Sequence, residues 1–173
     1  MTEWLGMTRG YRYPMEDPML QSGEPAPDFT LTDPTGRRVS LADLAGKDVI
    51  LYFYPKDDTP GCTKEACGFR DAWDDLRALG AVVIGVSPDA SASHQRFAGK
   101  YRLPFQLLSD PDRKVMEAYE AYGEKTLYGK KATGVIRSTV WIGPDGRVRR
   151  HWARITDAGA HPGRVLGALR EAL

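Results

Sequence analysis

Cysteine is scarce in this chain: there are two in 173 residues, Cys62 and Cys67. Such a low density excludes a disulfide-rich scaffold, which depends on many cross-links. Histidine is scarce too, with only His94, His151 and His161, none of them at metal-ligand spacing from the cysteines. Because a structural zinc site needs four such ligands, no metal site is expected.

Long apolar runs and excess charge are also missing. No stretch of about 18 apolar residues occurs, so no helix is expected to cross a bilayer. Lys and Arg number 24 against 23 Asp and Glu, so the net charge of +1 offers no general attraction for nucleic acid or a membrane surface. The first residues, M-T-E-W-L-G-M-T-R-G, lack the basic start and apolar stretch of a secretory signal, so a cytoplasmic protein is expected.

The length fits one domain with a short appendage. Residues 1–20 show no clear periodicity and are interpreted as an N-terminal extension of unknown role. Residues 21–173 are interpreted as the folded domain, because strand and helix patterns alternate from residue 29 onward.

The predicted elements form an α/β domain. F-T-L-T and R-R-V-S-L, joined by D-P-T-G, predict an N-terminal hairpin. Nearly continuous apolar runs at 48–54 and 81–87 predict strands covered on both faces. Apolar residues at steps of three and four predict one amphipathic helix over 63–79. Further strands are expected at 105–110, 135–142 and 147–152, and further helices at 41–45, 91–101, 113–119 and 162–173.

The order of these elements predicts the architecture. A strand–helix–strand unit followed by a hairpin and a last helix is the order of the thioredoxin fold. We therefore expect a mixed central sheet flanked by helices, with the N-terminal hairpin added to it.

Both cysteines lie in one segment, Y-F-Y-P-K-D-D-T-P-G-C-T-K-E-A-C, residues 52–67. Thr59 is a favoured N-cap residue and Pro60 suits the first helical position, so Cys62 is expected third in a helix. The positive end of the helix dipole there favours the nucleophilic thiolate. Full ionisation of a free thiol gains only about thirtyfold at neutral pH, so fast chemistry also needs donors aimed at the substrate.

Other interpretations of these motifs are weaker. A cysteine hydrolase needs a histidine base, and none is expected near Cys62. G-E-K-T-L-Y-G-K-K looks like a phosphate loop but has five residues between its glycines instead of four, and Lys131 where a hydroxyl belongs. Two incidental helix cysteines are the plain structural alternative, which the T-P-G-C turn after a buried strand disfavours.

The segment carries a family resemblance. P-K-D-D-T-P-G-C, residues 55–62, matches the P-x-x-x-T-x-x-C signature of peroxiredoxins. The surrounding residues, with P-A-P-D-F-T-L at 25–31, L-Y-G-K-K at 127–131 and I-R-S-T-V-W-I at 136–142, resemble the bacterioferritin comigratory protein subfamily, the Q-type thiol peroxidases. The resemblance covers about residues 22–173 and does not extend to residues 1–20.

This resemblance implies a peroxidase for H2O2 and small organic hydroperoxides that uses no metal or organic cofactor. Cys62 is then the peroxidatic thiolate that becomes a sulfenic acid, Cys67 resolves it as an intramolecular disulfide, and thioredoxin or a similar dithiol restores the pair. Pro55 shields the thiolate from water, Thr59 directs its hydroxyl at the peroxide, and Arg137 polarises the peroxide and stabilises the thiolate.

Several residues are interpreted directly from their surroundings. Arg137 lies inside an apolar run, which indicates a buried charge that needs a partner. Glu65 is interpreted as stabilising the dipole in the first helical turn. A cluster of arginines near the C-terminal hairpin is interpreted as a solvated strand face: Arg147, Arg149, Arg150 and Arg154.

A monomer without nucleic-acid or membrane partners is expected. Two alternatives of another class stay open: a redox sensor whose Cys62–Cys67 disulfide switches the binding of a partner, and a holdase-type chaperone.

The spacing of the cysteines makes a geometric prediction. Five helical residues give a rise of roughly 7.5 Å and a turn of roughly 140°, which places the two Cα atoms about 8.5 Å apart. A disulfide needs Cα atoms within about 7 Å. We therefore expect an intact helix with unbonded sulfurs in the reduced protein, and unwinding near residues 60–69 on oxidation.

Overall fold

A computed structural model describes residues 19–172 of the chain. Residues 1–18 of the predicted extension lie outside the described residues. Leu20, the last residue assigned to that extension, donates its backbone N–H to His151 Nδ1 at 2.8 Å and packs against the core. Leu20 is therefore in contact with the folded domain.

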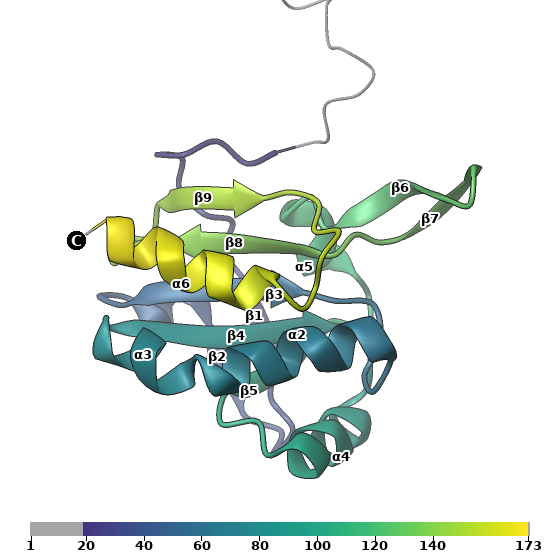
Figure 1. The fold of residues 1–173 in the computed structure, drawn as a ribbon, viewed down its shortest axis with the longest axis horizontal. Helices are drawn as coiled ribbons and strands as arrows, with labels where there is room; N and C mark the ends of the chain where they lie inside the picture. The colour runs from purple at the N-terminus through teal and green to yellow at the C-terminus, as the bar shows by residue number, and fades with distance from the viewer. Residues whose placement is uncertain (1–18, 173) are drawn as a thin grey trace, which may run out of the picture.

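Seven strands form one mixed sheet, as predicted, in the order β2-β1-β5-β4-β3-β8-β9 (Figure 1). β3, β4 and β5 are parallel neighbours at the centre, and the β1–β2 hairpin and the β8–β9 hairpin add to them with antiparallel pairing. The strands are β1 (Thr30–Thr32), β2 (Arg38–Ser40), β3 (Asp48–Phe53), β4 (Ala81–Ser87), β5 (Gln106–Ser109), β8 (Ser138–Ile142) and β9 (Val148–Trp152).

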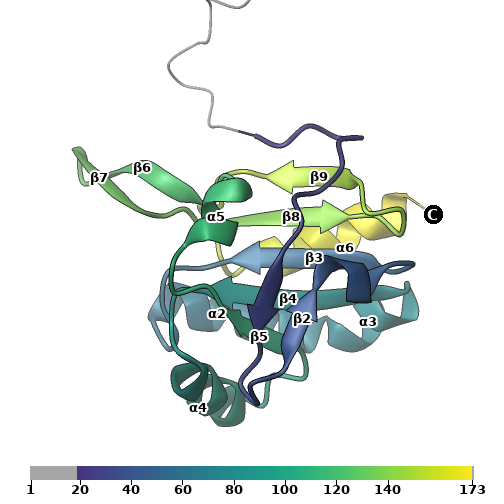
Figure 2. The same ribbon diagram turned by 180° about the vertical axis from the view of Figure 1, so that it is seen from behind.

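Helices cover both faces of this sheet. Figure 1 shows α2, α3 and α6 together on one face, and Figure 2, the view from behind, shows α5 on the other. The helices are η1, a 3-10 turn (Leu41–Leu44), α2 (Pro60–Asp71), α3 (Trp73–Ala78), α4 (Ser91–Tyr101), α5 (Lys114–Ala118) and α6 (His161–Glu171). The longest of them has 12 residues, and within residues 19–172 no helix is long and apolar enough to cross a bilayer.

The central strand β3 divides the core in two. Its side chains alternate between faces with a period of two, so the continuous apolar run fills both sides of the sheet. Ile50, Tyr52 and the following Tyr54 join the cluster beneath α2 and α6, which also contains Cys62. Val49, Leu51 and Phe53 join the opposite cluster. The reactive segment therefore starts from a central strand whose residues 49–53 are all buried.

The predicted single helix over 63–79 is in fact two helices. α2 ends at Asp71, Ala72 has φ −90° and ψ 0°, and α3 begins at Trp73. The apolar period continues through this bend, because Phe69 and Leu76 are both fully buried. The sequence pattern alone therefore could not locate the break.

A second, two-stranded sheet was not predicted at all. β6 (Tyr122–Leu127) and β7 (Lys130–Val135) pair antiparallel and project from the body of the domain (Figures 1 and 2). Their turn, Tyr128-Gly129, has positive φ at both residues, the geometry of a type I′ hairpin. Tyr-Gly is not the usual Asn-Gly signal, and the strands are largely polar and exposed, so the pattern did not reveal them. The segment G-E-K-T-L-Y-G-K-K, which looks like a phosphate loop in the sequence, forms part of this hairpin.

Candidate active site

The loop between β3 and α2 carries the predicted reactive residues. Tyr54 ends the pairing of β3 by donating its N–H to Val86 O at 3.1 Å, and half-buried Pro55 follows it. α2 begins at Pro60, so Cys62 is its third residue, as predicted, and its side chain is buried. The sheet thus delivers the sulfur to the first turn of a helix, near backbone N–H groups without helical partners.

Thr59 occupies the N-cap position of α2, but its hydroxyl does not cap the helix. Instead Thr59 Oγ1 donates a hydrogen bond to Lys56 O at 2.9 Å, across the loop that precedes the helix. The hydroxyl oxygen accepts no hydrogen bond from the first turn of the helix, so the capping part of the prediction is wrong. The hydroxyl oxygen keeps its lone pairs for another donor.

Arg137 directly contacts the Cys62 sulfur. It precedes β8, and the β3–β8 register pairs Phe53 with Ser138, so Arg137 arrives beside the end of β3. Its Nη2 donates to Cys62 Sγ at 3.2 Å. The approach depends on Gly61, since a Cβ there would lie 3.1 Å from Arg137 Nη2. Two residues far apart in sequence thus meet as predicted.

Glu65 has a different role from the predicted stabilisation of the helix dipole. It is fully buried, and its Oε1 accepts a hydrogen bond from Arg137 Nη1 at 2.8 Å. Glu65 lies one helical turn after Cys62 and therefore faces the core with it. A buried carboxylate requires an ionic partner, and Arg137 supplies it. One guanidinium thus bridges a carboxylate and a sulfur.

The charges of this triad perturb one another. Burial raises the pKa of Glu65 to about 7, although Arg137 pulls it in the opposite direction. Burial tends to lower the pKa of Arg137, but the negative charges of Glu65 and Cys62 outweigh it and raise the pKa above its ordinary value. Burial, followed by the charges of Glu65 and Cys62, raises the pKa of Tyr52 well above its usual range. The site therefore holds a permanent cation shared between two acidic groups.

Two polar atoms beside this triad have no hydrogen-bond partner among the described residues. They are Glu65 Oε2 and Tyr52 Oη, both buried. Tyr52 stacks at 4.9 Å between ring centroids on Phe69, which lies one turn beyond Glu65 on the same helix. The Cys62 sulfur thus shares an apolar cluster with Tyr52 and Phe69 and also contacts the charged Arg137.

Cys67 lies further along α2 and is half-buried. Both cysteines are free thiols within an intact helix, as the spacing predicted. Gly68, the next residue, packs closely on α6, because a Cβ there would lie 2.7 Å from Pro162 Cγ. The second thiol therefore belongs to a segment held against another helix.

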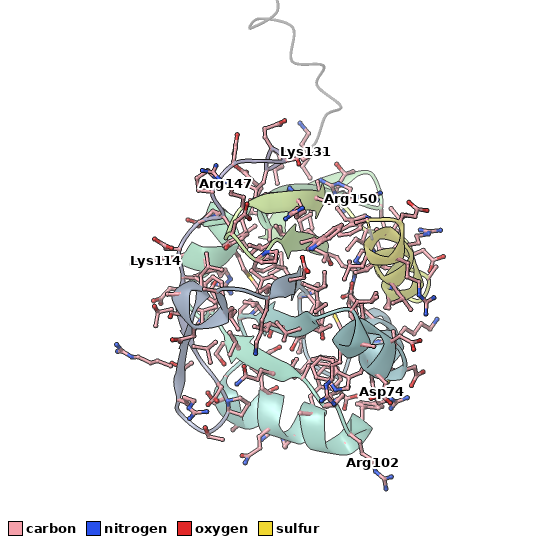
Figure 3. All side chains as sticks on the ribbon, turned by 90° about the vertical axis from the view of Figure 1, so that its left-hand side faces the viewer. Asp74, Arg102, Lys114, Lys131, Arg147 and Arg150 are labelled. Atoms are coloured by element: carbon pink, nitrogen blue, oxygen red, sulfur yellow. The ribbon has the colours of Figure 1, made fainter. Side chains whose placement is uncertain are left out.

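The arginine cluster is a surface feature, as expected. Arg147, Arg149, Arg150 and Arg154 are all exposed. Figure 3 shows Arg147 and Arg150 on the outside of the domain, and Arg150 lies 4.6 Å from the centre of the Trp152 ring. The cluster is therefore separate from the sulfur site.

Sequence reasoning missed the importance of Glu65 and of Asp57. For Glu65 a signal existed: Cys62, Glu65, Ala66 and Phe69 share one helical face, so a charge falls on an otherwise buried stripe. For Asp57 the signal was weak, because only Tyr54 among its partners is near in sequence and the others lie 32 to 37 positions away.

Comparison with known proteins agrees with this geometry. The AhpC/TSA family pattern matches residues 22–151. A putative peroxiredoxin Bcp of Coxiella burnetii is 50% identical over 150 residues, which cover 87% of this chain and 99% of the relative. Peroxiredoxin Bcp of Bacillus subtilis is 45% identical over 136 residues, 79% of this chain and 87% of the relative.

Solved structures give the same result. Peroxiredoxin Q of Xylella fastidiosa, in a cysteine-to-serine mutant, superposes with a TM-score of 0.82 at 31% identity and covers 90% of this chain and 98% of its own. The bacterioferritin comigratory protein of Xanthomonas campestris, studied for alkyl peroxide reduction, gives 0.80 at 35% identity over 88% and 99% of the two chains. The chain therefore belongs to the AhpC/TSA family and, within it, to the peroxiredoxins of the Bcp or Q type, which are thiol peroxidases.

Proposed function

We propose that this peroxidase reduces hydrogen peroxide and small organic hydroperoxides through Cys62, resolves the product through Cys67 and is recycled by thioredoxin or a similar dithiol. The contact that carries the proposal is the one between Arg137 Nη2 and Cys62 Sγ at 3.2 Å. A charge-assisted donor at this position stabilises a thiolate and lies where the oxygens of a peroxide must approach.

The first step is a displacement at oxygen. The Cys62 thiolate attacks the terminal oxygen of the hydroperoxide, the S–O bond forms as the O–O bond breaks, and the thiolate becomes a sulfenic acid. The leaving alkoxide takes a proton and departs as an alcohol, or as water when the substrate is H2O2. Arg137 stabilises the charge that develops on this oxygen. Thr59 contributes its hydroxyl to the peroxide, and Pro55 keeps bulk water from the sulfur.

The second step closes the disulfide. The Cys67 thiol attacks the Cys62 sulfur, a S–S bond forms, and the sulfenic oxygen leaves as water. An external dithiol then reduces the disulfide and is itself oxidised. Both cysteines lie in one helix, so the cycle requires no second chain, and a monomer suffices. The need for a dithiol reductant is met in the reducing cytoplasm, where we place the cycle.

Alkyl hydroperoxides belong to the proposed substrates because of one relative. The bacterioferritin comigratory protein of Xanthomonas campestris, which is 35% identical to this chain, was studied for alkyl peroxide reduction.

The test is peroxide consumption coupled to thioredoxin, thioredoxin reductase and NADPH. Wild-type protein should turn over steadily, Cys62→Ser should be inactive, and Cys67→Ser should react once and then stop. Turnover by Cys62→Ser within tenfold of wild type would refute the assignment of the nucleophile. A wild-type protein that is oxidised once and is never reduced by the dithiol would instead support a redox sensor.

A further inference from the structure

Asp57 is a buried carboxylate in the middle of the loop that carries Pro55 and Thr59. Its Oδ1 accepts a hydrogen bond from Tyr54 Oη at 2.6 Å. Its Oδ2 lies 2.7 Å from His94 Nδ1 and accepts a hydrogen bond from Ser93 Oγ at 2.8 Å. Its backbone N–H donates to Asp89 Oδ2 at 2.8 Å. Both carboxylate oxygens and the backbone N–H of Asp57 therefore have hydrogen-bond partners, although the residue lies in a loop.

His94 is the centre of this network and is completely buried. Its Nδ1 faces the Asp57 carboxylate, and its Nε2 lies 3.1 Å from Leu108 O, a carbonyl of β5. Both neighbours can accept a hydrogen bond from the ring. The geometry is that of a buried histidine–carboxylate pair, joined through Nδ1 and held from the other side by a strand carbonyl.

The charge of Asp57 fits this arrangement. Burial pushes the pKa of Asp57 upward, but the hydrogen bonds from His94, Tyr54 and Ser93 outweigh it and hold the pKa below its ordinary value. The carboxylate is therefore ionised in the folded protein, and its buried charge depends on these hydrogen bonds. Removal of His94 alone leaves that charge with fewer donors.

The network joins the reactive loop to three other elements. Ser93 and His94 belong to the first turn of α4, Leu108 belongs to β5, and Asp89 lies in the connection from β4 to α4. Asp89 is in turn fixed by Ser87 Oγ, which donates to its Oδ2 at 2.8 Å. Asp57, Asp89 and His94 lie close enough to hold a cation, but the carboxylate oxygens that face the cluster already accept hydrogen bonds from the protein. The cluster is an internal anchor.

We propose that Asp57 and His94 are positioning residues for the peroxide reaction: their buried hydrogen-bonded pair fixes the loop and so places Pro55 and Thr59 correctly relative to Cys62 and Arg137. The inference rests on the proposed function. Asp57 is two residues from Pro55 and two from Thr59, so its anchor constrains both. A misplacement of about 1 Å in such a site costs on the order of a hundredfold in rate.

The neighbouring aspartate provides the contrast. Asp58 Oδ2 pairs with Lys100 Nζ at 2.8 Å, yet the two side chains are 42% and 58% exposed. Exposed pairs of this kind are screened by water and salt and contribute little. Asp57→Asn and Asp58→Asn therefore make the same chemical change at adjacent positions, one inside the anchor and one outside it.

The experiment compares the rates of two reactions of Cys62 in wild type, Asp57→Asn, His94→Gln, the double variant and Asp58→Asn. Rapid-mixing kinetics give the second-order rate constant with H2O2, and alkylation by iodoacetamide reports access to the thiolate without the orientation that peroxide needs. We expect Asp57→Asn and His94→Gln each to slow the peroxide reaction by about tenfold or more. Alkylation should stay equal or rise, and Asp58→Asn should stay within about twofold of wild type.

The double variant tests whether the two residues act as a pair. Each single variant already breaks the contact between the two side chains, so the second substitution should add little further loss. The double variant should therefore react faster than two independent, multiplied losses would give. Amide exchange across residues 54–60 should accelerate in both single variants, with circular dichroism unchanged.

The contradicting outcomes are distinct. A folded Asp57→Asn protein whose peroxide rate matches that of Asp58→Asn would overturn the inference and leave the proposed function intact. Inactive wild-type protein would overturn the proposed function and the inference with it. If Asp57→Asn does not fold, Ser93→Ala removes one hydrogen bond from the same carboxylate and keeps its contact with His94. It should slow the peroxide reaction by about threefold and accelerate loop exchange, and the absence of both effects would overturn the inference.

Discussion

Arg137 donates to Glu65 Oε1 at 2.8 Å with one nitrogen and to Cys62 Sγ at 3.2 Å with the other. The hydrogen bond to Glu65 thus holds the guanidinium in the orientation in which it also contacts the Cys62 sulfur. Since both acidic groups are buried, each responds to the charge of the other through the shared cation. Several measurable properties depend on this relationship.

Substitution Glu65→Gln should change how stability depends on pH. The pKa of Glu65 rises from 4.5 to about 7 in the folded chain, so the folded protein retains a proton that the unfolded chain releases. Below about pH 4.5 this group makes its full contribution to the free energy of unfolding. The contribution is lost as pH rises to about 7, and the loss amounts to up to about 3 kcal/mol. Relative to wild type, the glutamine variant should therefore gain stability across this window in urea unfolding.

The histidines do not obscure this comparison. Burial lowers the pKa of His151 and of His161 to about 4, so each reduces stability as pH falls below its ordinary value of 6.5. Both contributions are the same in the two proteins and cancel in the difference. Parallel stability profiles for wild type and Glu65→Gln would show that this carboxyl does not titrate near neutrality.

Substitution Arg137→Ala should slow the reaction with peroxide by at least about a hundredfold, the scale of one lost donor in a transition state. Stopped-flow kinetics with H2O2 measure the loss. Arg147→Ala, at an exposed position next to β9, is the matched control and should react like wild type. Unchanged kinetics for Arg137→Ala would remove this residue from the chemistry.

Substitution Cys67→Ser should leave Cys62 able to react once and then stall as a sulfenic acid. Excess peroxide should next convert it to sulfinic acid, because no thiol of the same chain can intercept the intermediate. Mass spectrometry of the cysteine peptide follows the addition of one and then two oxygens. Wild type at the same peroxide dose should show mainly the disulfide, and a variant without added oxygen at Cys62 would contradict the cycle.

Oxidation should unwind the start of α2. The intact helix runs from Pro60 to Asp71, and its geometry keeps the two sulfurs apart, so the disulfide requires local unfolding. Amide exchange across residues 60–69 should be faster in the oxidised protein, and Trp73 fluorescence offers a second signal. Equal protection in both redox states, or a disulfide only between two chains on a non-reducing gel, would rule this mechanism out.

The unwinding should stop near the end of α2. Phe69 is fully buried against Tyr52, and Arg70 Nη1 donates to Tyr101 O of α4 at 2.9 Å. Both contacts oppose the loss of structure beyond residue 70, so exchange at residues 71–78 should differ little between the redox states.

The sequence predicted the site best where local rules dominate. Helix initiation depends on the residues next to it, so the T-P-G-C turn placed Cys62 correctly in the first turn of α2. The apolar period of β3 likewise predicted a central strand buried on both faces. The resemblance then supplied Arg137, which lies 75 residues away in the chain and could not be paired with Cys62 from spacing alone.

The failures concern interactions that depend on packing. Thr59 has a favoured capping side chain, yet its hydroxyl donates to Lys56 O and accepts no hydrogen bond from the helix. Glu65 was interpreted as stabilising the helix dipole, and only the orientation of α2 on the sheet shows that it is buried. The β6–β7 hairpin lacks an apolar face, so no burial pattern marked it in the sequence.

The close contact between Gly68 and Pro162 has a consequence for the reduction potential of the cysteine pair. In the proposed cycle the helix and the disulfide are competing states of one segment, so the packing of α2 on α6 enters the reduction potential of the cysteine pair. A shift of 1.4 kcal/mol in helix stability corresponds to about 30 mV in that potential. A side chain at position 68 would crowd Pro162 at 2.7 Å, weaken the reduced helix and make the disulfide harder to reduce. The electrochemical midpoint of the enzyme is thus adjustable from α6, a helix that contains no cysteine.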